Sequence, residues 1–156
     1  MSRFRSIAPL ALAALAALGA GLAACAPTDP EGAAPPEEGP RVAFANLADG
    51  DVVASPLNVC LEATGIAIAA SGEVHEGEGH HHVLVDLTAE ERASYATPGV
   101  AIPKDVDPRL VHLGDGGTCK ELELEPGEHT LTAVVADGGH VTLDPPVMAD
   151  VTITVE

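Results

Sequence analysis

The chain has 156 residues and a net charge of −17 at pH 7, with 24 Asp and Glu against 7 Lys and Arg. Nucleic-acid binding needs a basic footprint, so this charge excludes it, and docking on anionic lipid is disfavoured. The acidity is explained by solubility or by attraction of cations. There is no tryptophan, which argues against an aromatic platform for stacking sugars or bases.

Residues 1–24 have the pattern of a bacterial lipoprotein signal peptide. Two arginines give a positive start, and an Ala- and Leu-rich stretch ends in LAAC at Cys25. The apolar stretch has the length of a signal peptide and is short for a membrane span. Cysteine after two small residues resembles the lipobox, in which this cysteine carries the lipid. We therefore predict export and lipidation at Cys25; an ordinary signal peptide with an incidental cysteine is the alternative.

The predicted location is the cell envelope. If the source is Gram-negative, we expect the periplasmic side of the outer membrane, because alanine rather than aspartate follows Cys25. Residues 25–40 continue as an acidic segment rich in proline. Such a composition cannot bury enough apolar surface to fold, so we expect an extended tether. Residues 41–156 then form one small domain.

Apolar and polar residues alternate with a period of two through most of this domain, which predicts β-strands. Seven or eight short strands are expected, separated by turns rich in Gly, Asp and Pro. They cover residues 41–47, 55–65, 66–72, 80–87, 109–113, 118–125, 129–137 and 147–156. After the fourth, Thr88 precedes Glu91 by three residues, the spacing of a capping box that opens a short helical turn. The pattern is typical of an all-β protein with an antiparallel β-sandwich.

Two cysteines in the domain are predicted to form a disulfide. Cys60 and Cys119 each alternate with apolar positions in their strands, so both thiols fall on the polar face. A pair of outward thiols in an exported protein, which meets an oxidising compartment, indicates a surface bridge between strands. A metal site built from cysteine and histidine is the alternative.

Three consecutive histidines, His80, His81 and His82, open the strand expected at residues 80–87. Alternate residues of a strand share a face, so His80 and His82 point together and His81 points the other way. Residues two apart lie roughly 6.5–7 Å apart, and their imidazoles can converge on one ion bound at about 2.0–2.1 Å. Two ligands are too few, so others must come from elsewhere in the fold.

His112 and His140 each stand at a strand end beside a Gly-rich turn, and such turns gather at one end of a sandwich. We predict that they complete a metal site with His80 and His82. Imidazole ligands favour Zn²⁺ or Cu²⁺; a small polar ligand in the same pocket is the alternative. Residues that could support the site, as ligands or by fixing a histidine tautomer, are His81, Asp86, Asp137 and Asp144.

Several motifs resemble, in their order, the bacterial domain-of-unknown-function family 4399 (DUF4399). They include GEGHHHVLVD, IPKD, HLGDGGT, PGEHTL and ADGGHVTLDPPV, and they spread over residues 44–156. The resemblance implies an exported Ig-like β-sandwich and no established activity. The two cysteines are not part of the family pattern, so the predicted disulfide depends on strand phase alone.

Motifs of common enzymes are absent from the sequence: it has no Gly-x-Ser-x-Gly, no phosphate-binding loop and no His-Glu-x-x-His. We therefore expect a small envelope lipoprotein that binds a metal or a polar ligand, with no catalytic residues. Its expected partners are the membrane, through the N-terminal lipid, and that ligand. A purely structural or protein-interaction module is the alternative, and a metal-assisted hydrolase is a third hypothesis.

Overall fold

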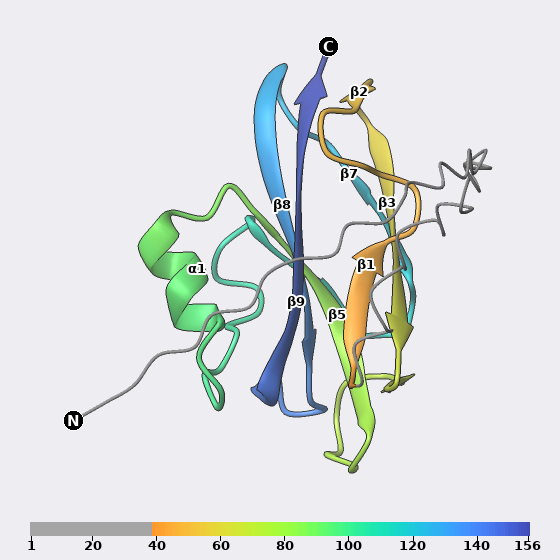
Figure 1. The fold of residues 1–156 in the computed structure, drawn as a ribbon, viewed down its shortest axis with the longest axis vertical. Helices are drawn as coiled ribbons and strands as arrows, with labels where there is room; N and C mark the ends of the chain where they lie inside the picture. Colours follow the sequence, from red (N-terminus) through yellow and green to blue (C-terminus); the bar gives the residue numbers. More distant parts are fainter. Residues whose placement is uncertain (1–38) are drawn as a thin grey trace, which may run out of the picture. The chain divides into compact units, whose positions relative to one another are not determined.

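The computed structural model describes residues 39–156 of the chain (Figure 1). The predicted signal peptide, Cys25 and most of the predicted tether lie outside the described residues. In the part that is described, no helix is both long and apolar enough to cross a membrane.

Nine strands within residues 39–156 form two sheets. The smaller sheet has the order β1-β3-β7, from β1 (Arg41–Phe44), β3 (Leu57–Thr64) and β7 (Cys119–Leu122). The larger sheet has the order β2-β9-β8-β5-β4, with β6 also paired to β5. Its strands are β2 (Val52–Val53), β9 (Thr142–Val155), β8 (Gly127–Ala136), β5 (Glu78–Val85), β4 (Ala67–Ile68) and β6 (Leu110–Leu113). The predicted all-β, sandwich-like fold is confirmed.

The strand β5 lies inside the larger sheet. One of its edges pairs with β8, and the other pairs first with β4 and then with β6. Because neighbours cover both edges, all but the first of its eight residues are buried. The three histidines of the sequence are therefore interior residues of a central strand.

Two details of the strands differ from the prediction. The strand expected at residues 66–72 is reduced to two residues, β4, which pair in parallel with β5; β2 and β9 also pair in parallel. The last strand begins at Thr142 instead of residue 147. Thr142 pairs with Ala136 and Val147 pairs with Val135, so the four residues between Thr142 and Val147 form a bulge that remains part of the strand. Two prolines fall within this bulge, where they need not donate ladder hydrogen bonds. Proline therefore does not end the strand.

The main core lies between the two sheets. It is formed by aliphatic side chains that alternate with outward residues along the strands, including Val59, Leu61, Val83, Leu131 and Ile153. None of these five side chains is more than 2% exposed. Their alternation is what the period-two pattern predicts for strands that contribute one face to a core.

A second apolar cluster covers the opposite face of the larger sheet. Leu84 of β5 and Val134 of β8 contribute to it, together with Ile102 from the segment that follows α1 (Ala89–Tyr95). In Figure 1, α1 lies on the side of β8 and β9 away from β1 and β3. The helix begins with the predicted capping box, in which Thr88 and Glu91 each accept a backbone N–H of the other. The central strands of the larger sheet are thus buried on both faces.

Candidate metal centre

Four histidines from three parts of the chain meet in the structure. His80 and His82 come from β5, His112 comes from β6, and His140 lies in the turn between β8 and β9. One ring nitrogen of each can be chosen so that all four lie within 4.8 Å of one another. We call this set the histidine tetrad. It contains the four residues that the sequence predicted as ligands.

The tetrad lies on the outer face of the larger sheet, near strand ends as the sequence predicted, since His140 is in the turn between β8 and β9 and β5 begins at Glu78. His80 and His82 alternate with His81 and Val83, so they share a face with Leu84 of the second apolar cluster. His112 is the direct partner of His82 in the β5–β6 pairing. The segment after α1 reaches the same place, since Ile102 N–H donates to the His140 carbonyl at 2.8 Å.

The nitrogens are spaced as ligands of one ion would be. The Nε2 atoms of His80 and His82 are 3.0 Å apart, and those of His112 and His140 are 3.1 Å apart. A tetrahedral Zn²⁺ site with bonds of 2.0–2.1 Å separates its nitrogens by about 3.3–3.4 Å. A square-planar Cu²⁺ site separates neighbouring nitrogens by about 2.9 Å. The distance within each pair fits either ion, and because the four nitrogens span up to 4.8 Å, the two pairs must move closer together to bind one.

The side chains of the tetrad satisfy one another only in part, through one hydrogen bond between His80 and His82 and one between His112 and His140. His80 and His82 have no exposed surface, and the Nδ1 atom of each has no hydrogen-bond partner among the described residues. An unpartnered buried polar atom costs roughly 1–3 kcal/mol. The rings are also crowded, with centroids 4.7–5.7 Å apart. The same strand leaves a third buried imidazole nitrogen, His81 Nε2, without a partner among the described residues.

The environment keeps the buried imidazoles neutral. Desolvation, followed by the nearby His140 and His112, lowers the pKa of His80 to about 4. Desolvation, followed by His80 and His112, lowers the pKa of His82 to about 2. The pKa of His112 is also lowered, chiefly by desolvation and by His140. At neutral pH these rings hold the free lone pairs that a metal ion needs.

Asp137 fixes the turn that presents His140. Its Oδ1 accepts the N–H groups of Gly139 at 2.8 Å and Val141 at 2.9 Å, and its carbonyl accepts the His140 N–H at 2.9 Å. His140 itself has φ of 67°, a left-handed conformation that few non-glycine residues adopt. The turn therefore holds a strained backbone at the residue whose ring completes the tetrad.

His112 connects the tetrad to the surface. A cavity of about 550 Å³ is lined by His112, Asp105 and Lys120, among others. A second cavity of about 360 Å³ is lined by His112, Asp115 and Lys120, among others. An ion or small chelator can therefore approach His112 from open, polar cavities, while His80 and His82 lie behind it.

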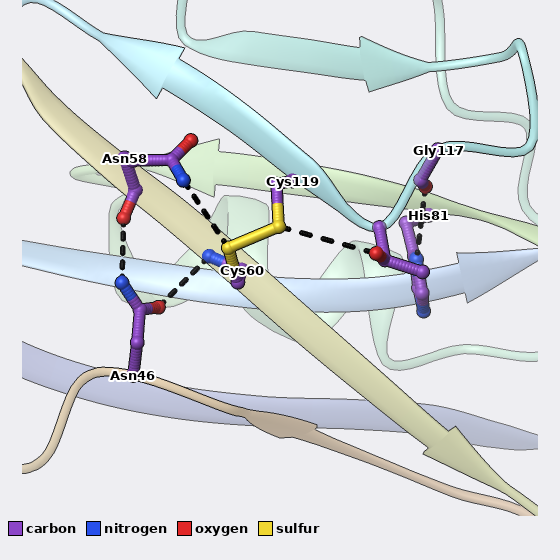
Figure 2. The surroundings of a disulfide bond; sticks show 7 residues. Asn46, Asn58, Cys60, His81, Gly117 and Cys119 are labelled. Atoms are coloured by element: carbon purple, nitrogen blue, oxygen red, sulfur yellow. Dashed lines mark hydrogen bonds between the residues drawn. A yellow bond between two sulfur atoms is a disulfide. The ribbon is translucent and has the colours of Figure 1, made fainter.

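Three of the expected supporting residues lie away from the tetrad. His81 faces the opposite side of β5, where its Nδ1 lies 3.5 Å from the Gly117 carbonyl (Figure 2). Asp86 contacts His129, as described below. Asp144 lies in the β9 bulge and lines a separate cavity that includes none of the four histidines. The expectation that His81 and Asp86 support the site is wrong, because His81 lies on the other face of β5 and Asp86 lies beyond the end of that strand.

Cys60 and Cys119 form the predicted disulfide, with an S–S distance of 2.15 Å (Figure 2). They are direct partners in the antiparallel pairing of β3 with β7. Cys119 is exposed and Cys60 is partly so. The Cys60 N–H donates to Asn46 Oδ1 at 2.9 Å. The bridge therefore lies on the outer face of the smaller sheet, as the strand phase required.

His129 makes a separate polar contact, with a pH dependence that can be predicted. Its Nδ1 lies 2.7 Å from Asp86 Oδ2 and its Nε2 lies 2.8 Å from the Glu125 carbonyl. Both partners are acceptors, so only the imidazolium, with two N–H groups, satisfies both. Burial lowers the pKa of His129, but the hydrogen bonds to Glu125 and Asp86 outweigh it and the pKa is raised.

We expect His129→Gln to destabilise the fold by about 1 kcal/mol below pH 6.5, the usual value of such a hydrogen bond. A raised pKa in the folded state means that this stabilisation is complete below the unfolded value of 6.5. It is then lost as the pH rises through the folded pKa. Urea unfolding of both proteins between pH 5 and pH 9 measures the difference. A difference that is constant with pH, or that grows toward pH 9, would contradict this assignment.

Comparison with known protein families identifies the family to which the chain belongs. The family model described as "Domain of unknown function (DUF4399)" matches residues 59–156, more than half of the chain and all four histidines of the tetrad. No curated protein and no solved structure matches the chain significantly. The match begins within β3, later than residue 44, where the resemblance of the motifs begins. The chain is a member of the DUF4399 family.

Proposed function

We propose that the protein binds one Zn²⁺ or Cu²⁺ ion through the imidazoles of His80, His82, His112 and His140. The observation that supports this most directly is the convergence of four ring nitrogens, from three separate segments, to within 4.8 Å. The neutral rings, whose nitrogen lone pairs are free at pH 7, support it as well. Histidine nitrogen is the ligand that both ions accept readily.

The number of ligands favours binding over catalysis. Structural zinc sites use four protein ligands, whereas catalytic ones use three and leave a position open for water. A complete tetrad leaves no position for water on a four-coordinate ion. We therefore propose a metal-binding protein without enzymatic activity. The cavities beside His112 support exchange of the ion with the surroundings.

Metal content of the purified protein tests this proposal. Tag-free protein is freed of metal with a chelator, equilibrated with Zn²⁺ or with Cu²⁺ at pH 7.5, and passed through a desalting column. We expect one ion per chain by elemental analysis. If calorimetric titration shows neither ion bound more tightly than about 100 μM, roughly −5.5 kcal/mol, the proposal fails. The protein would then be a structural or interaction module.

We also propose that the protein is an exported lipoprotein of the cell envelope, anchored through Cys25. The charged start, the Ala- and Leu-rich stretch and the LAAC motif support this proposal. The tether, residues 25–40, would let the domain reach away from the membrane surface. An anchored domain with an exchangeable metal ion would retain that ion within the envelope.

Replacing Cys25 with serine tests the anchor. Serine lacks the thiol that accepts lipid, so Cys25→Ser should abolish labelling by a radioactive fatty acid and move the protein out of the membrane fraction. Ala33→Ser is the matched control, since it adds the same hydroxyl within the predicted tether and should leave lipid labelling intact. Labelling that persists in Cys25→Ser would show that another residue carries the lipid.

A further inference from the structure

Gly114 lies against the ring of one proposed ligand. If Gly114 carried a Cβ, that atom would overlap Cε1 and Nε2 of His112 and would lie 2.7 Å from Ser71 Oγ. Gly114 does not have the left-handed φ that usually explains a glycine. Glycine is needed at this position for lack of space, because the imidazole of His112 fills the position that a side chain would occupy.

The backbone around Gly114 is held in place, so it cannot move away from a new side chain. The Gly114 carbonyl accepts the Ser71 N–H at 2.9 Å and the Ser71 hydroxyl at 3.2 Å. The preceding residue, Leu113, is 3% exposed and pairs with His81 of β5. The His112 ring is partly exposed and borders two cavities. Of the groups in conflict, the ring is the one that has space to move.

We propose that Gly114 is a positioning residue for the metal site: the absence of its side chain allows His112 to point into the tetrad. This inference rests on the proposed metal binding and goes beyond it, because Gly114 offers no ligand atom. Any larger residue at position 114 would turn the His112 ring out toward the cavities. The chain would then keep all four histidines while presenting three to the metal.

Gly114→Ala is the direct test. We expect the metal affinity to fall by about 10–100-fold, the range seen when residues that orient metal ligands are replaced. The fall should match that of His112→Ala within about threefold. Gly117→Ala is the matched control, because the three atoms nearest to a Cβ there all belong to the Asp115 side chain of the same loop and none belongs to a histidine. Gly117→Ala should bind metal as the parent does.

A double-variant cycle separates positioning from a general effect on folding. In a His112→Ala background, Gly114→Ala should lower the affinity no further, because the ring that it displaces is gone. The Cu²⁺ d–d absorption band should shift to the same longer wavelength in Gly114→Ala and in His112→Ala, since water replaces one imidazole in both. Thermal unfolding of the metal-free variants records any loss of stability separately.

Two outcomes would overturn the inference. One is a Gly114→Ala protein that binds metal as tightly as a metal-binding parent. The other is a further loss of affinity when Gly114→Ala is added to His112→Ala, which would show a role unrelated to that ring. A parent that binds no metal would instead refute the proposed function on which the inference rests.

Discussion

Replacing both β5 ligands, as His80→Ala/His82→Ala, is expected to abolish tight metal binding. The two rings supply the buried half of the tetrad, and their Nε2 atoms lie 3.0 Å apart. The remaining His112 and His140 are partly exposed and too few for a four-coordinate ion. Calorimetric titration at pH 7.5 should show binding weaker than about 100 μM, roughly −5.5 kcal/mol.

Two further variants make this result interpretable. His75→Ala removes an exposed histidine that is not part of the tetrad, so it should bind as the parent does. His140→Ala removes a ligand from a turn without opening the buried strand, so it should weaken binding while the fold keeps its stability. Parent-like affinity in the double variant would mean that the metal binds elsewhere and that the tetrad is structural.

The second large effect is expected on stability, from loss of the disulfide. The bridge links residues 59 apart in sequence, and closing a loop of this size stabilises a fold by about 4 kcal/mol in the chain-entropy treatment. The strand β7 pairs with β3 and with no other strand among the described residues. It therefore depends on this bridge more than a central strand would. The total free energy of unfolding of a domain of this size is about 5–15 kcal/mol.

Cys60→Ala/Cys119→Ala should therefore lower the free energy of unfolding by up to about 4 kcal/mol in urea titrations. Reductant should destabilise the parent by a comparable amount and leave the double variant unchanged. Mass spectrometry without reductant should identify the bridged peptides in the parent. A double variant as stable as the parent, or two freely alkylated thiols in the native parent, would show that the bridge does not hold this fold.

The sequence predicted those features that depend on the phase of a strand. Alternation placed Leu57, Val59 and Leu61 in the core and turned Cys60 outward, so the disulfide could be inferred before its partner strand was known. The same phase paired His80 with His82 and separated them from His81. The structure agrees for β3 because one face of that strand is buried and the other is exposed.

The sequence did not predict which face of the larger sheet holds the tetrad. The run HHHVLV is compatible with one buried face or two, and only the cover supplied by Ile102 and its neighbours buries the second. That segment lies in an irregular, proline-bound stretch with no period to interpret. The meeting of the four histidines near strand ends was predicted, but the face of the sheet on which they meet was not.

The sequence pattern shows which face a residue shares but not how far along the strand it lies, and this misplaced Asp86. Asp86 shares a face with His82 in the sequence pattern, but four residues of strand separate them by roughly 13 Å. Asp86 instead contacts His129 on the neighbouring strand β8. Gly114 was missed for a related reason: a glycine needed for space has no signature of its own, and its role becomes visible only when the His112 ring is placed.

The structure relates the metal site to the disulfide through one short connection. The β6–β7 loop runs from the strand of His112 to Cys119 and contains Gly114. The carbonyl of Gly117 in the same loop lies 3.5 Å from His81 Nδ1, on the other face of β5 (Figure 2). One loop thus connects a ligand strand of the larger sheet with the bridged strand of the smaller sheet.

The binding of one metal ion by the tetrad can be tested by crystallography. The protein is crystallised with one equivalent of Zn²⁺, and anomalous data are collected at the zinc edge. We predict one strong anomalous peak enclosed by His80, His82, His112 and His140, about 2.0–2.1 Å from a nitrogen of each. The peak locates the ion without reference to any variant. A tetrad left empty while zinc occupies an acidic surface loop would contradict the account.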